Sequence, residues 1–198
     1  WVAFFDQPNL REAWSVSDWA QMDLVERFID LWLPVAEIAV QERITPLFPP
    51  LKPGGDYWDL SFLEGALQSL KRRGQNLLLE KIGLSAYAWT GSRSLDWGAG
   101  GPARWPDARP YLTPDGSQDH LGFHIFDWYE AVALKEIGHE MPIFLLRAGS
   151  VPGDVPDSQT GEPDLIAHAD RNLKIAELLE RLDDAGNPLI SPHVVCCN

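Results

Sequence analysis

The residues best suited to chemistry stand at positions 6 to 9, where Asp6-Gln7-Pro8-Asn9 follows the short apolar run at 2–5. That run of Val, Ala and two Phe is typical of a buried strand. Pro8 has no amide hydrogen and disfavours helix at the residue before it, so we expect the strand to end there. In α/β proteins, ligand-binding residues gather at the carboxyl-terminal ends of parallel strands. Asp6, Gln7 and Asn9 are therefore the first candidate site residues.

Aromatic residues form a second candidate group, because the chain has 9 Trp, 8 Phe and 4 Tyr. Four of the tryptophans lie in stretches rich in Gly and Pro, outside the expected core: Trp58, Trp89, Trp97 and Trp105. Aromatic rings on loops can form the floor of a sugar site, because their faces pack against apolar C–H groups. Rings in such places can equally hold long loops against the rest of the fold, and the sequence favours neither interpretation.

The composition narrows the class of protein. A chain of 198 residues that is 45% hydrophobic can bury a substantial core, and a single domain is expected. The net charge of -13 argues against nucleic acid or an anionic membrane as a partner. No apolar run approaches the ~20 residues of a membrane span, since the longest candidate, 28–40, contains Asp30, Pro34 and Glu37. We therefore expect no membrane insertion.

Apolar runs typical of strands begin near positions 2, 44, 82, 142 and 193, and a helical pattern separates each pair. The helices are expected at about 15–41, 59–73, 119–137 and 164–182. Such alternation predicts an α/β fold with parallel strands that are adjacent in sequence order. Long loops follow the strands and short ones follow the helices, which favours a (β/α)8 barrel.

A complete barrel needs ~250 residues, so five strands and four connecting helices are too few. We interpret residues 1–198 as the last five strands of a barrel, truncated at both ends, with the rest of the barrel N-terminal to Trp1. Trp1 stands where Met is expected, so a signal peptide would not be visible. The adjacent Cys196 and Cys197 are expected to be thiols, because neighbouring Cα atoms lie too close for a normal disulfide.

Details of three segments complete the expected fold. Asp119 is expected to cap a helix that runs to Ile137, and the last helix is expected to bury one apolar face: Leu165, Ala169, Leu173, Ala176 and Leu179. His120 and His124 have a spacing that can hold a metal, but no third ligand is evident, so we expect structural roles and no metal. The Gly-, Pro- and Trp-rich stretch 90–119 is expected to be an ordered, functional loop.

Three of these strands resemble those of a known family. Asp6-Gln7-Pro8-Asn9 resembles the fourth-strand Asn-Glu-Pro motif of the large clan of retaining (β/α)8-barrel glycoside hydrolases, in which Glu is the general acid/base. The segment 142–149 resembles the clan's seventh strand, Pro-Ile-x-Leu-Thr-Glu-x-Gly, whose Glu is the nucleophile. The segment 84–89 is similar to the sixth strand, which brings an aromatic residue or His to the site.

The departures from the clan's pattern decide what the resemblance implies. Retaining hydrolysis needs two carboxyl groups ~5–5.5 Å apart. Gln7 stands at the acid/base position and Arg147 at the nucleophile position. Gln cannot transfer a proton and Arg cannot act as a nucleophile or base, so we expect no catalytic residue and no cofactor. Both side chains can still hydrogen-bond a sugar.

The resemblance therefore implies a non-catalytic protein that binds a carbohydrate or cell-wall glycan, outside the cell or in its envelope. The expected substrate-binding residues are Asp6, Gln7, Asn9, Tyr57, Trp58, Tyr87, Trp89, Trp97, Trp105 and Arg147. Gln7 and Arg147 are expected to approach each other across the barrel. Asp6 is expected to point into the wall, because successive strand residues face opposite ways.

Two alternatives stay open. An active glycosidase could use other carboxylates, and Asp6, Asp59 and Asp96 are available. A structural barrel in a larger assembly could have its mouth plugged by the loop 90–119.

Overall fold

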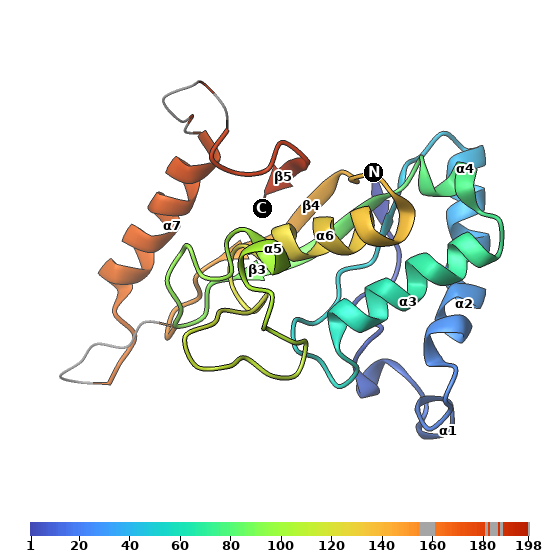
Figure 1. Cartoon of the computed structure of the whole chain (residues 1–198), viewed down its shortest axis with the longest axis horizontal. Coiled ribbons are helices and arrows are strands. Elements are labelled where there is room, and N and C mark those ends of the chain that lie inside the picture. The colour runs from blue at the N-terminus through green and yellow to red at the C-terminus, as the bar shows by residue number, and fades with distance from the viewer. Residues whose placement is uncertain (155–160, 181, 183–185, 187, 198) are drawn as a thin grey trace.

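The computed structural model describes residues 1–154, 161–180, 182, 186 and 188–197. In these residues the chain forms an α/β fold around one five-stranded parallel sheet (Figure 1). The strands are β1 (Val2–Ala3), β2 (Pro46–Phe48), β3 (Gly83–Trp89), β4 (Ile143–Gly149) and β5 (Val194–Cys197). Each strand pairs in parallel with the next one in sequence, in the order β1-β2-β3-β4-β5. The predicted parallel, sequential strand order is confirmed.

Helices connect the strands as the alternating pattern predicts. The described residues form α1 (Val16–Trp19), α2 (Leu24–Gln41), α3 (Asp59–Arg72), α4 (Asn76–Leu79), α5 (Gly101–Arg104), α6 (Ile125–Ile137) and α7 (Leu165–Glu180), with a 3-10 turn at Arg11–Ala13. The longer helices α2, α3, α6 and α7 each connect two successive strands. In Figure 1, α3 and α6 lie in front of the sheet, with α2 at one side and α7 at the other.

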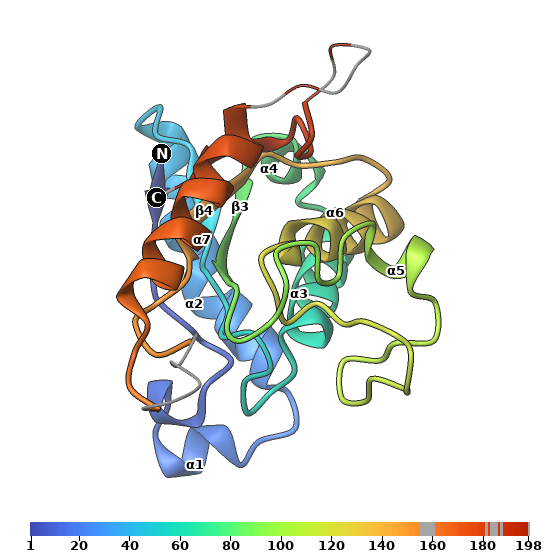
Figure 2. The same ribbon diagram turned by 90° about the vertical axis from the view of Figure 1, so that its left-hand side faces the viewer.

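The face of the sheet that α3 and α6 cover holds the core (Figure 2). Leu84 and Ala86 of β3, with Leu145 of β4, point into this layer and are almost completely buried. Phe28 of α2 and Phe48 of β2 meet edge to face, with their ring centroids 5.8 Å apart. We call this side of the sheet the helix-covered face.

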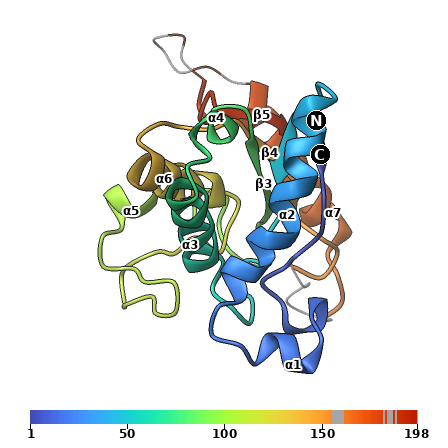
Figure 3. The same ribbon diagram turned by 90° about the vertical axis from the view of Figure 1, so that its right-hand side faces the viewer.

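Helix α2 packs along the same layer beside α3, at the β1 edge of the sheet (Figure 3). Glu26 of α2 accepts hydrogen bonds from Arg73 and Ser69 of α3, and these bonds lower the pKa of Glu26 to about 2. The charged cluster therefore joins the two helices as long as Glu26 is ionised.

The opposite side, which we call the open face, carries the alternate strand residues. Tyr87 of β3 and Phe144 of β4 point to this side, outside the core cluster. Trp1 packs on Phe144 with ring centroids 4.5 Å apart, although Trp1 is 60% exposed.

Helix α6 begins at Ile125, so the expected start at Asp119 is wrong. The carboxylate of Asp119 is already occupied within its own loop. It accepts hydrogen bonds from the indole of Trp97, the hydroxyl of Thr113 and the backbone N–H of Leu121. A side chain with these partners has no free oxygen to cap a helix.

The expected inward face of α7 is also wrong. Its residues are exposed in the structure: Leu165, Ala169, Leu173, Ala176 and Leu179. Ile175 is the buried residue of this helix instead. Hydrogen bonds to two loops determine which side of α7 faces the core. Arg171 donates to the carbonyl of Gly91 over 2.7 Å, and Asn172 accepts from the N–H of Ser150 over 2.9 Å.

Cys197 is partly buried against the core at the end of β5. The side chain of Cys196 lies outside the described part of the chain, so the structure does not test the expected state of this cysteine pair.

Candidate functional site

The candidate site lies at the carboxyl-terminal ends of β1, β3 and β4, on the open face of the sheet. A β-bulge shapes it, because Ala86 pairs with Leu145 while Tyr87 pairs with Arg147, which leaves Leu146 as an extra residue in β4. An extra residue reverses the side-chain alternation beyond it. The bulge therefore brings Arg147 to the same face as Tyr87.

Tyr87 is the centre of a small cluster on this face. Its hydroxyl donates a hydrogen bond to Asp6 Oδ1 over 2.7 Å, and the guanidinium carbon of Arg147 lies 5.3 Å from its ring centroid. Burial, followed by the bond to Asp6, raises the pKa of Tyr87 to about 12. Tyr87 is therefore a neutral donor at ordinary pH, and it fixes the position of the Asp6 carboxylate.

Asp6 reaches this cluster although the sequence predicts that it points into the wall. The expectation is wrong because strand alternation stops early: β1 ends at Ala3, and Phe5 and Gln7 have positive φ angles of 70° and 47°. The left-handed backbone turns the chain between these residues. Asp6 thus faces Tyr87.

The expected approach of the Gln7 side chain to Arg147 stays a prediction, because the described contacts of Gln7 are those of its backbone. Its backbone N–H donates to the carbonyl of Pro50 over 2.9 Å, which ties the turn after β1 to the loop after β2. Within the described residues, no hydrogen bond joins the side chains of Gln7 and Arg147. Asp6 is the residue of this motif that the structure brings to the Tyr87 cluster.

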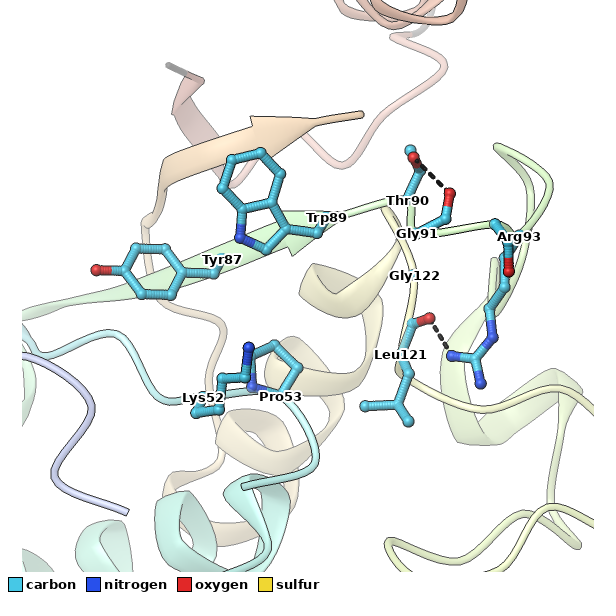
Figure 4. A pocket seen from close by; sticks show the side chains of 10 residues that line it. Lys52, Pro53, Tyr87, Trp89, Thr90, Gly91, Arg93, Leu121 and Gly122 are labelled. Atoms are coloured by element: carbon cyan, nitrogen blue, oxygen red, sulfur yellow. Dashed lines mark hydrogen bonds between the residues drawn. The ribbon is translucent and has the colours of Figure 1, made fainter. Parts of the chain in front are cut away.

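A pocket of about 330 Å³ lies beside the cluster (Figure 4). Tyr87 and Trp89 contribute its wall on β3, and Lys52 and Pro53 face them from the loop after β2. Arg93, Leu121 and the turn at 90–92 complete the lining. Tyr87 and Trp89 were predicted from the sequence, whereas Lys52 and Arg93 were not, because nothing in their local pattern marks them.

Arg93 is held rigidly at the edge of this pocket. Its guanidinium donates to the carbonyl of Leu121, lies 2.9 Å from Asp119 Oδ1 and stacks 4.9 Å from the ring of Trp97. Burial would raise the pKa of Asp119, but hydrogen bonds from Thr113 and Trp97, with the charge of Arg93, lower it overall. These groups satisfy one another, so they stabilise the loop rather than face a ligand.

Asn9 is completely buried and fully hydrogen-bonded. Its side-chain amide donates to the carbonyls of Lys52 and Tyr57, and its oxygen accepts from the N–H of Lys52. No polar atom of this side chain is left for a ligand. Asn9 instead fixes the loop that carries Lys52.

Four other expected aromatic site residues lie outside the pocket lining. The indole N–H of Trp97 donates to Asp119. The ring of Tyr57 packs on Phe62 at 5.5 Å, and the ring of Trp58 stacks on Tyr111 at 4.5 Å. Trp105 donates its indole N–H to the carbonyl of Ala99. The stretch that contains Trp105 lies beside α5 on the side of α3 and α6 (Figure 2), away from the open face.

Asp59, one of the carboxylates proposed for an active enzyme, is completely buried between α3 and α6. It accepts hydrogen bonds from His120 Nε2 over 2.9 Å, from Gly54 N–H over 3.0 Å and from the Tyr129 hydroxyl over 3.4 Å. Burial, followed by the charge of Asp59, raises the pKa of Tyr129 well above its ordinary value. Asp59 is therefore a core residue that no substrate reaches.

Asp96 stands in the loop after β3, where a hydrogen bond from Ser94 leads the causes that lower its pKa. The buried Asp59 therefore forms no pair with Asp6, while a catalytic use of Asp96 stays a prediction, because paired catalytic carboxyl groups lie ~5–9.5 Å apart and share no hydrogen bond.

Among the described residues, no group of three His, Cys, Asp or Glu side chains could hold a metal ion. His120 contacts Asp59, and His124 Nδ1 lies 3.1 Å from Asp127 Oδ2. The described helices include none long and apolar enough to cross a membrane.

Comparisons with family models, with curated proteins and with solved structures give no match to this chain. The likeness to glycoside hydrolases therefore rests on the strand motifs of the sequence alone.

Proposed function

We propose that this protein binds a carbohydrate, without hydrolysing it, at the carboxyl-terminal ends of β1, β3 and β4. The observation that carries the proposal is a pocket lined by Tyr87 and Trp89, beside which Asp6 and Arg147 contact Tyr87 on the same face of the sheet. A sugar presents apolar C–H faces and many hydroxyl groups. Aromatic rings suit the first, and a carboxylate with a guanidinium suits the second.

The size and shape of the pocket support a small polar ligand. A volume of about 330 Å³ is at the lower end of the ~300–1,000 Å³ typical of ligand sites. Trp89 is partly exposed at the rim, where its ring can stack on one sugar unit. The side chain of Arg147 is exposed and makes no hydrogen bond to any described residue, so its donors are free to bind a second unit.

The absence of hydrolysis follows from the residues at the two positions that the glycoside hydrolase motifs assign to catalysis. Gln7 has no titratable proton and Arg147 has no nucleophilic oxygen. Asp6 is the carboxylate that remains at this site, and a retaining or inverting reaction needs two carboxyl groups on opposite sides of the bond.

We also propose that the sheet is part of an eight-stranded barrel that three further βα units close between β5 and β1. Three features support this arrangement: the strand order is strictly sequential, helices cover one face of the sheet, and aromatic residues lie on the other. The exposed apolar residues of α7 support it as well, because a neighbouring helix would bury them. A location outside the cell or in its envelope, with a cell-wall glycan as partner, belongs to the same proposal.

Glycan-array screening followed by calorimetric titration of the bound oligosaccharide tests the proposal. We expect saturable binding that Trp89→Ala weakens by about tenfold or more, because one stacked ring contributes on the order of 1–2 kcal/mol. Trp58→Ala is the matched control, since Trp58 is exposed but lies outside the pocket lining. The control should bind like the unchanged protein.

Two results would overturn the proposal. Failure to bind any neutral or charged glycan would remove the carbohydrate function. Hydrolysis of a bound glycan that Asp6→Asn abolishes would replace the binding protein by an active enzyme.

A further inference from the structure

We propose that the bound carbohydrate carries a carboxylate, as a uronic acid does, and that Lys52 and Arg147 recognise this group. The inference rests on the proposed function, because it names the class of sugar that the same site takes. It begins with the distribution of charge over the molecule.

Carboxylates greatly outnumber basic groups in this chain, whose net charge is -13. Six described lysines and arginines have an acidic partner within ion-pair distance: Arg27, Arg72, Arg73, Arg93, Lys135 and Lys174. The other described lysines and arginines make no ion pair with a described carboxylate. Two of these are at the site, since Lys52 lines the pocket and Arg147 lies over the ring of Tyr87.

Both cations lie near Tyr87. Lys52 lines the pocket with Tyr87 and Trp89, and Figure 4 shows it on the loop that faces β3. Arg147 is not part of the pocket lining, but its guanidinium carbon lies 5.3 Å from the ring centroid of Tyr87. Tyr87 therefore links the pocket that Lys52 lines to the guanidinium of Arg147.

The backbone around each cation is fixed before any ligand binds. The buried amide of Asn9 bonds to both the N–H and the carbonyl of Lys52. Arg147 is placed by the β-bulge and by its pairing with Tyr87. A preorganised site loses less conformational entropy on binding, so the fixed loops favour recognition of a defined group.

The local charges favour a carboxylate over a neutral sugar. Asp119 already neutralises Arg93, and the carboxylate of Asp6 holds the hydroxyl of Tyr87. Lys52 and Arg147 then bring two positive charges against the single negative charge of Asp6, whose hydrogen-bond partner Tyr87 is neutral. A guanidinium binds a planar carboxylate through two parallel N–H donors, which gives both strength and orientation.

Matched pairs of oligosaccharides test the inference. Oligomers of galacturonate, guluronate, mannuronate and glucuronate are titrated beside their carboxyl-reduced, neutral counterparts, which keep the same ring stereochemistry. We expect the acidic member of the preferred pair to bind at least about tenfold more tightly at low ionic strength. That preference should shrink as salt rises from 50 to 500 mM, because the two cations are exposed.

Charge-removing variants identify the residues. Lys52→Met and Arg147→Gln should each lower the affinity for the acidic oligomer about fivefold to tenfold, with little effect on its reduced counterpart. Lys52→Arg should keep most of the preference. Lys81→Met and Arg43→Gln remove the same charges at the amino-terminal end of the strands, next to Ile82 and Ile44, and should leave the preference unchanged. Far-ultraviolet circular dichroism checks that all variants are folded.

The outcomes separate the two proposals. Equal binding of acidic and reduced oligomers, or a preference that survives both charge-removing variants, would overturn the inference and leave carbohydrate binding in place. Equal binding of dextran sulfate would also overturn it, because a nonspecific anion site would then suffice. No binding of any oligomer would overturn the proposed function as well.

Discussion

The two faces of the sheet differ in how completely their polar groups are satisfied. On the helix-covered face, Asp59 is completely buried and its oxygens accept bonds from His120, Gly54 and Tyr129. On the open face, the side chain of Arg147 is exposed. It contacts the ring of Tyr87 and makes no hydrogen bond to any described residue. The polar groups of the helix-covered face stabilise the fold, whereas the open face has side-chain donors that are available to a ligand.

This difference separates stability from binding in the molecule. Buried polar groups with partners contribute to folding, and the loss of one partner leaves the others unsatisfied. Exposed groups at the end of a parallel sheet contribute little to folding. Variants of the helix-covered face should therefore destabilise the protein, while variants of the open face should change what it binds.

The largest effect is expected for Asp59→Ala. The substitution removes the acceptor of two buried donors, His120 and Tyr129, and of the Gly54 N–H, so the free energy of unfolding should fall by about 3 kcal/mol. Urea unfolding followed by fluorescence measures the change. Asp59→Asn keeps one acceptor oxygen and should cost less. A loss below about 1 kcal/mol for Asp59→Ala would show that the buried network does not hold α3 to α6.

A smaller effect is expected on α7, where the sequence and the structure disagree about the buried face. Ile175→Ala should lower the free energy of unfolding by about 2 kcal/mol, because Ile175 is the buried residue of this helix. Leu173→Ala, on the expected inward face, should change it by less than about 0.5 kcal/mol, since Leu173 is exposed. Thermal unfolding of the two variants compares the faces directly, and the reverse order of effects would support the rotation predicted from the sequence.

The sequence predicts the strand order well, because the apolar runs at 82–89 and 142–149 are long and their alternation with helices leaves few topologies. It does not predict the rotation of α7. Periodicity marks Leu165 and Leu173 as inward, whereas the bonds from Arg171 and Asn172 to distant loops turn the helix the other way. Long-range polar contacts of this kind leave no local pattern.

The site is predictable to the same limited degree. Tyr87 and Trp89 follow from their place near the end of a strand, and both line the pocket. Asp6 and Arg147 were selected as site residues, but their orientations depend on two positive φ angles and one β-bulge. No glycine stands at the two positive φ angles or at the bulge, so the sequence does not indicate either feature. Lys52 enters the site through the buried amide of Asn9, which acts across 43 residues of chain.

The smallest effect is expected for Tyr87→Phe on the open face, and it carries a dependence on pH. The substitution removes the hydrogen bond to Asp6, so the free energy of unfolding should fall by about 1 kcal/mol at pH 7. Tyr111→Phe is the matched control, because the Tyr111 ring stacks on Trp58 and its hydroxyl has no partner among the described residues. The control should change the free energy by less than about 0.5 kcal/mol.

Alkaline unfolding experiments then sharpen this test. The folded-state pKa of Tyr87 is raised to about 12 by burial and by Asp6, above the value of ~10 for an unfolded tyrosine. Because the folded state holds the phenolic proton more tightly, the contribution of Tyr87 is fully present below pH ~10 and is lost as the pH rises toward 12. The difference in stability between the unchanged protein and Tyr87→Phe should therefore narrow over this range. A constant difference across the range would mean that folding does not raise the pKa of Tyr87, which contradicts a buried hydroxyl that is bound to the Asp6 carboxylate.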